Sequence, residues 1–244
     1  MHEASEERTD LGLFGPGSVT WHVMGEPVLI VGGIRALLLQ ALHPRTMWGT
    51  AQNSELMDPS AAWARLVRTV EFVRVRTYGT HEEVERVGRR VRRLHSKLTG
   101  LDMRTGETFP VDDPENLLWV HMGEVDSYLD VARRAGVPLT ARDADAFVDE
   151  QRRAAEVVGL DPADVPATVA DMRDYYAGMR RQIFACREAR EGCAACSARP
   201  CRGRCCRSSS PRPASGCWSC RRCRAGPAAC TGCRACRPRT WPRR

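Results

Sequence analysis

The sequence predicts an all-α fold: a single domain of six or seven helices, followed by a disordered tail rich in cysteine and arginine. Three observations predict it. Apolar residues recur at three- and four-residue spacings, no segment alternates convincingly as a half-buried strand does, and helix-start patterns repeat along the chain. We therefore expect a loose lead-in over residues 1–17, a helical domain over 18–185 and a low-complexity tail over 186–244.

The expected helices are delimited by capping residues, prolines and glycines. Asp58-Pro59 and Asp113-Pro114 each combine an N-cap with a proline in the first turn, and Thr80 with Glu83 has the spacing of a capping box. His43-Pro44 stops or kinks the apolar helix before it, because proline disfavours helical backbone at the preceding residue. Helices are predicted over residues 18–24, 28–42, 59–78, 81–98, 117–135, 140–158 and 167–184, with a polar loop over 101–112.

The distribution of charged residues and cysteines differs sharply between two parts of the chain. All twelve cysteines lie in residues 186–244, together with fifteen arginines and two glutamates, so this segment carries +13. The whole chain carries +7, which leaves −6 for residues 1–185. Nucleic-acid binding by the helical domain therefore has no support from charge. The tail has too few large apolar residues to offset the entropy lost on ordering its backbone.

The N-terminus is polar and acid-rich, with no apolar run behind a basic start. The longest apolar stretch, residues 28–42, is shorter than the ~20 residues needed to span a bilayer. We therefore expect a cytoplasmic protein without a transmembrane segment.

One face of the helix over 59–78 gathers polar and charged side chains beside an apolar stripe. Its members follow helical spacing and are Arg65, Arg68, Thr69, Phe72 and Arg76. This face is either a solvated rim or a row of cations that faces an anionic ligand with carboxylates or phosphates.

Histidines are the other candidates. His95 adjoins the apolar stripe of its helix, so it is either a core histidine or an iron or zinc ligand. His43 lies at a helix break, and His121 lies on an otherwise apolar helix. No zinc-protease pair, nucleophile elbow, Walker loop or dinucleotide-binding glycine pattern accompanies them. A lone histidine and a separate helix of cations suit haem, which needs one axial ligand and partners for its propionates.

Four motifs occur in an order that resembles the MpaB/rubber-oxygenase family, which includes the latex clearing proteins. The resemblance covers roughly residues 18–184 and implies an all-helical domain that binds one haem b. The motifs are Leu37-Leu38-Leu39-Gln40-Ala41-Leu42-His43-Pro44, Arg65-Leu66-Val67-Arg68-Thr69, Val91-Arg92-Arg93-Leu94-His95, and Trp119-Val120-His121 with Val125-Asp126-Ser127.

The resemblance also implies roles for individual residues. His95 matches the axial iron ligand, and Arg65 and Thr69 match residues that lie over the haem. The implied chemistry is dioxygen-dependent cleavage of a double bond in a small apolar substrate such as an isoprenoid. His43, His121 and Asp126 lie in family motifs, with a structural role favoured. Where latex clearing proteins have a lysine able to cap the iron, this chain has Arg68, whose guanidinium stays protonated and is a poor ligand.

Two alternatives to an oxygenase stay open. One is a non-catalytic haem-binding or sensing protein of the same fold. The other is a zinc or nucleic-acid binder that acts through the tail, whose Cys-x-x-Cys spacings, as in Cys217-x-x-Cys220-x-x-Cys223, can ligate metal.

The composition of the tail also leads us to hypothesise that a frameshift replaced the native C-terminus after about Ala185. A sequencing read of the locus without a one-base slip would contradict this hypothesis.

Overall fold

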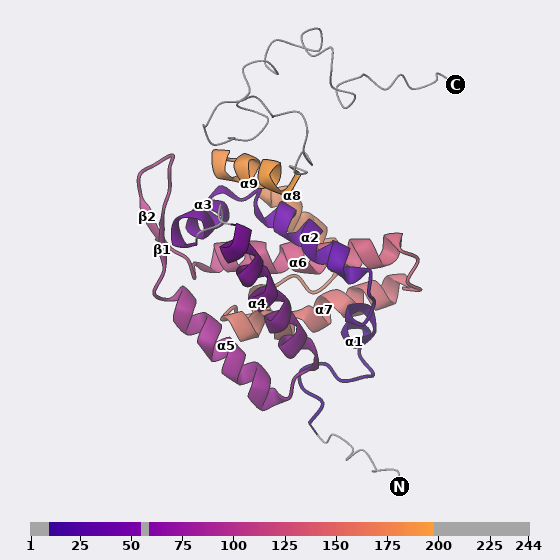
Figure 1. Ribbon diagram of the computed structural model, residues 1–244. Coiled ribbons are helices and arrows are strands. Elements are labelled where there is room, and N and C mark those ends of the chain that lie inside the picture. Colours follow the sequence, from indigo (N-terminus) through magenta and orange to yellow (C-terminus); the bar gives the residue numbers. More distant parts are fainter. Residues whose placement is uncertain (1–9, 55–58, 198–244) are drawn as a thin grey trace, which may run out of the picture. The chain divides into compact units, whose positions relative to one another are not determined.

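The computed structural model describes residues 10–54 and 59–197 (Figure 1). These ranges are predominantly helical, which confirms the predicted all-α class. In chain order their elements are α1 Val19–Met24, α2 Leu29–Gln40, α3 Pro44–Asn53, α4 Pro59–Tyr78, α5 His81–His95, β1 Thr99–Leu101, β2 Thr108–Pro110, α6 Pro114–Arg134, α7 Ala141–Val158, the 3-10 turn η1 Pro162–Asp164, α8 Val169–Met179 and α9 Arg187–Ser197. No helix in the described ranges is long and apolar enough to cross a membrane.

Local capping explains where most of these helices begin. The Ser18 side chain accepts a hydrogen bond from the Trp21 backbone, and Thr80 forms the expected capping box with Glu83. Asp113 caps α6 through the backbone N–H of residue 115. The predicted N-cap Asp58 lies outside the described residues.

Several segments differ from the predicted secondary structure; the helix predicted over 167–184, for example, ends at Met179. The chain does not simply break at His43-Pro44: a further helix, α3, begins there, because the His43 side chain caps its N-terminus and proline suits the first turn. The loop predicted over 101–112 contains strand β2. It pairs with β1 as an antiparallel hairpin, in which Gly100 lies opposite Phe109. Consequently α5 ends at His95 rather than at residue 98, and β1 follows almost at once.

The core is built around α6, which lies between α2 and α7 (Figure 1). Trp119 on α6 is fully buried and donates from Nε1 to the Gln40 carbonyl of α2 at 3.0 Å. The Gln40 amide in turn donates to the Val120 carbonyl at 3.0 Å. At Gly32 the helices approach so closely that a Cβ would come 2.8 Å from the Tyr128 ring. These contacts fix the register of α2 against α6.

A smaller core cluster changes our view of where the tail begins. Cys186 and Ala189 are buried against Met47 and Trp48 of α3, and the Trp48 indole donates to Glu188 at 3.1 Å. Disorder was expected from residue 186 onward, but Arg187–Ser197 form α9, whose first turn contributes to this cluster. Small apolar residues at helical spacing suffice here because α3 supplies the large side chains. The rest of the tail, including the Cys217-x-x-Cys220-x-x-Cys223 pattern, lies outside the described residues.

Candidate functional site

Arg65 on α4 is the best-placed cation of the predicted site. Its guanidinium donates to the hydroxyls of Ser54 at 3.1 Å and Thr50 at 3.5 Å, both at the end of α3. Within the described ranges no carboxylate pairs with it. Burial, and then the positive charge of Arg68, lowers the pKa of Arg65. The group stays protonated at neutral pH, so this region holds a partly buried positive charge that no described carboxylate neutralises.

The two neighbours that complete the Arg-x-x-Arg-Thr pattern differ in exposure. Arg68 is exposed and forms no hydrogen bond or ion pair with any residue that the structure describes. The hydroxyl of Thr69 donates to the backbone carbonyl of Arg65 at 3.1 Å. This bond uses the hydroxyl proton of Thr69, so the hydroxyl can form further hydrogen bonds only as an acceptor.

His95 ends α5 on the side that faces the domain interior. Its Nδ1 is buried and has no hydrogen-bond partner among the described residues. Burial lowers the pKa of His95, Asp112 partly opposes this effect, and Arg65 adds to it. The imidazole is therefore neutral at physiological pH, which is the form that ligates a metal. The electrostatic influence of Arg65 also places the two predicted residues in one region.

Further along α4, Arg76 and His121 form a buried polar group. Arg76 pairs with Glu124 of α6 at 2.9 Å and lies over the Phe72 ring. Both ring nitrogens of His121 and the Nε of Arg76 are buried without a partner in the described part of the chain. Burial, and then the charge of Arg76, lowers the pKa of His121 to about 3. His121 is thus a neutral imidazole with unused hydrogen-bonding capacity.

His43 and Asp126 make contacts that hold helices together. The Nδ1 of His43 accepts from the Thr46 backbone at 3.4 Å, and its ring stacks obliquely on Trp119. Asp126 pairs with Arg35 of α2 at 2.7 Å. No hydrogen bond or ion pair joins either side chain to Arg65 or His95 in the residues described.

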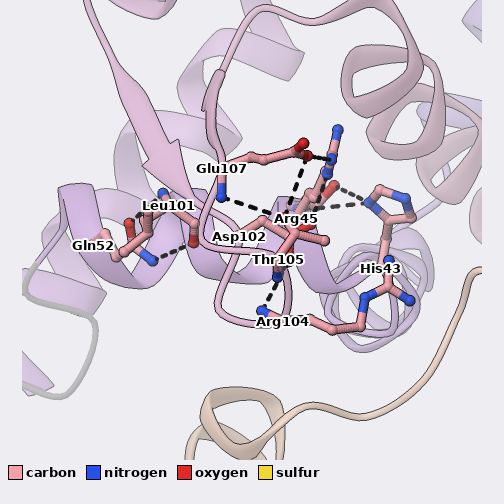
Figure 2. A network of polar contacts seen from close by, with 9 residues as sticks. His43, Arg45, Gln52, Leu101, Asp102, Arg104, Thr105 and Glu107 are labelled. Atoms are coloured by element: carbon pink, nitrogen blue, oxygen red, sulfur yellow. Dashed lines mark hydrogen bonds and ion pairs between the residues drawn. The ribbon is translucent and has the colours of Figure 1, made fainter.

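Sequence reasoning missed the support that α3 and the hairpin give to the site. Buried Asp102 pairs with Arg45 of α3 at 3.0 Å and accepts from two backbone N–H groups of the hairpin turn (Figure 2). Gln52 bonds to both the N–H and the carbonyl of Leu101. These bonds anchor α3, the helix that presents Thr50 to Arg65. They join residues about fifty positions apart, and no local pattern marks them.

Exposed apolar side chains lie on the face of α4 opposite Arg65 and Thr69. Trp63, Val67 and Val70 follow helical spacing and are exposed, Trp63 by 66%. Two shallow surface hollows, one beside His22 and one beside Arg152, include none of the predicted site residues.

The fold and these side chains define an all-helical domain. In the part of the chain that the structure describes, an imidazole with a buried, unpartnered Nδ1 lies near an arginine that pairs with no carboxylate. Compared with known protein families, residues 21–226 match the family described as "ER-bound oxygenase mpaB/B'/Rubber oxygenase, catalytic domain". The chain therefore belongs to the mpaB/rubber oxygenase family. The match extends beyond residue 184, where the resemblance seen in the sequence ended. No curated protein and no solved structure matched the chain.

Proposed function

We propose that the chain is a haem b-dependent oxygenase, which uses dioxygen to cleave a double bond in an isoprenoid-like or other small apolar substrate. One observation carries the proposal: the Nδ1 of His95 is buried without a partner among the described residues, and the ring lies in the electrostatic range of Arg65. A buried polar atom without a partner costs about 1–3 kcal/mol, so such an atom indicates a ligand, an ion or water in the functional state.

The residues present fit haem in charge and in donor chemistry. His95 would hold the iron through a neutral ring nitrogen. Arg65 would donate to a propionate, since neutral hydroxyls position it and no described carboxylate neutralises it. Bound haem supplies iron that activates dioxygen. In the described ranges no three His, Cys, Asp or Glu side chains cluster to hold a metal ion, but haem iron requires only one protein ligand.

The other residues have defined tasks in this proposal. Arg68 stays protonated and exposed, so it would attract a propionate or polarise an oxygen atom rather than ligate iron. Thr69 would accept a hydrogen bond through its free lone pairs. His121 has a pKa of about 3, so it offers a hydrogen bond without releasing a proton at neutral pH.

The absorption spectrum of the full chain, expressed with haem available, tests the proposal. We expect a Soret band that is lost or shifted in His95→Ala and unchanged in His22→Ala, an exposed histidine outside the site. A well-folded wild-type chain that takes up no haem would contradict haem binding.

Oxygen consumption with a prenylated substrate then separates an oxygenase from a haem-binding sensor of the same fold. Haem uptake without oxygen consumption would favour the sensor.

A further inference from the structure

The outer face of α5 carries an unbroken row of cations. Arg86, Arg90 and Arg93 lie at i, i+4 and i+7, and Lys97 continues the row in the turn that follows. All four side chains are exposed, and none forms an ion pair with a residue that the structure describes. We call these four residues the α5 cationic row.

The orientation of α5 explains why this row faces outward. The opposite side of the helix is buried: a Cβ at Gly88 would come 2.9 Å from the Val157 side chain of α7, and Arg92 donates to the Val157 carbonyl at 2.7 Å. Arg89 beside the row and Arg92 on the buried side share Glu85 as their partner. Glu85 therefore neutralises cations next to the row, whereas no described residue forms an ion pair with the row itself.

Exposed apolar side chains lie next to the row and in the hairpin that follows it along the chain. Leu94 lies beside the row and is 55% exposed, and Leu101 and Met103 of the hairpin are 41% and 61% exposed. The hairpin is joined firmly to α5, because Leu98 donates to the His95 carbonyl and accepts from Val111 across the hairpin base. Cations and apolar side chains therefore belong to one continuous piece of structure.

We propose that the α5 cationic row, with Leu94 and the hairpin tip, is a surface that docks on anionic lipid membranes. Clustered arginine and lysine on one helix face attract acidic headgroups, and neighbouring apolar side chains enter the headgroup boundary. The domain as a whole carries negative charge, so general attraction to anions does not explain the surface. A nucleic acid is disfavoured because no described aromatic side chain lies in this surface to stack on bases. The proposal does not depend on haem or on oxygenase activity.

Hydrogen–deuterium exchange of the full chain, read peptide by peptide, tests the proposal locally. The local readout matters because the arginine-rich tail also attracts acidic lipid. With vesicles of phosphatidylcholine and phosphatidylserine at physiological salt, we expect slower exchange over residues 93–106, and no change with phosphatidylcholine alone. Arg86→Gln/Arg90→Gln/Arg93→Gln should abolish this protection, whereas the corresponding lysine variant should keep it.

A matched control removes the same charge elsewhere. Arg133→Gln/Arg142→Gln/Arg173→Gln alters three exposed arginines on α6, α7 and α8 and should leave the protection unchanged. Circular dichroism confirms that each variant is folded. Protection that survives in the α5 glutamine variant, or that is lost equally in the control, overturns the proposal. Protection by an oligonucleotide but not by the acidic vesicles overturns it in favour of a nucleic-acid partner.

Discussion

His121 should dominate the loss of stability of this domain in mild acid. Its side chain is buried on α6, where burial and then Arg76 lower its pKa from 6.5 to about 3. In the unfolded chain the imidazole regains the ordinary value. Between these two values only the unfolded state binds the proton, so acid favours unfolding. The stability contributed by neutral His121 is complete above about pH 6.5 and is lost as the pH falls toward 3.

The expected magnitude follows from the unfolded pKa. A pH of 5 is about 1.5 units below the pKa of the imidazole in the unfolded chain, which is therefore protonated. The folded imidazole is still neutral at this pH. At about 1.36 kcal/mol per unit, His121 alone lowers the free energy of unfolding by about 2 kcal/mol between pH 8 and pH 5.

Urea unfolding followed by circular dichroism at pH 8 and pH 5 measures this effect. The wild type should lose about 2 kcal/mol more than His121→Gln does over the same interval, because glutamine does not titrate. Each variant is compared with itself at the two pH values, so a general loss of stability cancels. Exposed His22→Gln should behave as the wild type does. If His121→Gln keeps the full pH dependence, the reasoning from burial is wrong.

Three further substitutions test other contacts. Glu124→Gln leaves the buried Arg76 guanidinium without its partner and should cost about 3 kcal/mol in urea unfolding; a loss below about 1 kcal/mol would show that water reaches the pair. Trp119→Phe removes the indole donor to α2 and should cost about 1 kcal/mol, and unchanged stability would mean that this bond contributes nothing. Ser54→Ala removes a hydrogen-bond acceptor that positions the Arg65 guanidinium, and should weaken haem binding severalfold in a haem titration. Ser54→Thr should restore the affinity. Equal affinities would argue against Arg65 as a haem contact.

Local sequence rules predicted much of the fold. The capping box at Thr80 and the cap at Asp113 were readable because each cap involves residues only two or three positions apart. By contrast, α3 was missed because its N-cap is a histidine, which is outside the usual set of capping residues. The hairpin was missed because its strands have three residues each, too few to establish an alternating pattern.

The candidate site was predictable only in part, for a related reason. Helical spacing correctly placed Arg65, Arg68 and Thr69 together on α4, and family resemblance pointed to His95. What holds Arg65 in place comes from α3, across a bend in the chain that no periodicity describes. Likewise, no sequence pattern announces that His121 is buried without a hydrogen-bond partner, since that depends on the packing of α4 against α6.

The contact between α9 and α3 has a consequence for the order in which the domain forms. A ribosome makes Trp48 well before Glu188, yet the indole donates to that carboxylate and lies in the same buried cluster as Cys186. A nascent chain that has not yet released α9 therefore displays an uncovered tryptophan on α3. Synthesis must proceed well past residue 190, until α9 has left the ribosome, before this part of α3 can be covered. A ribosome stalled earlier would present this unsealed surface to chaperones.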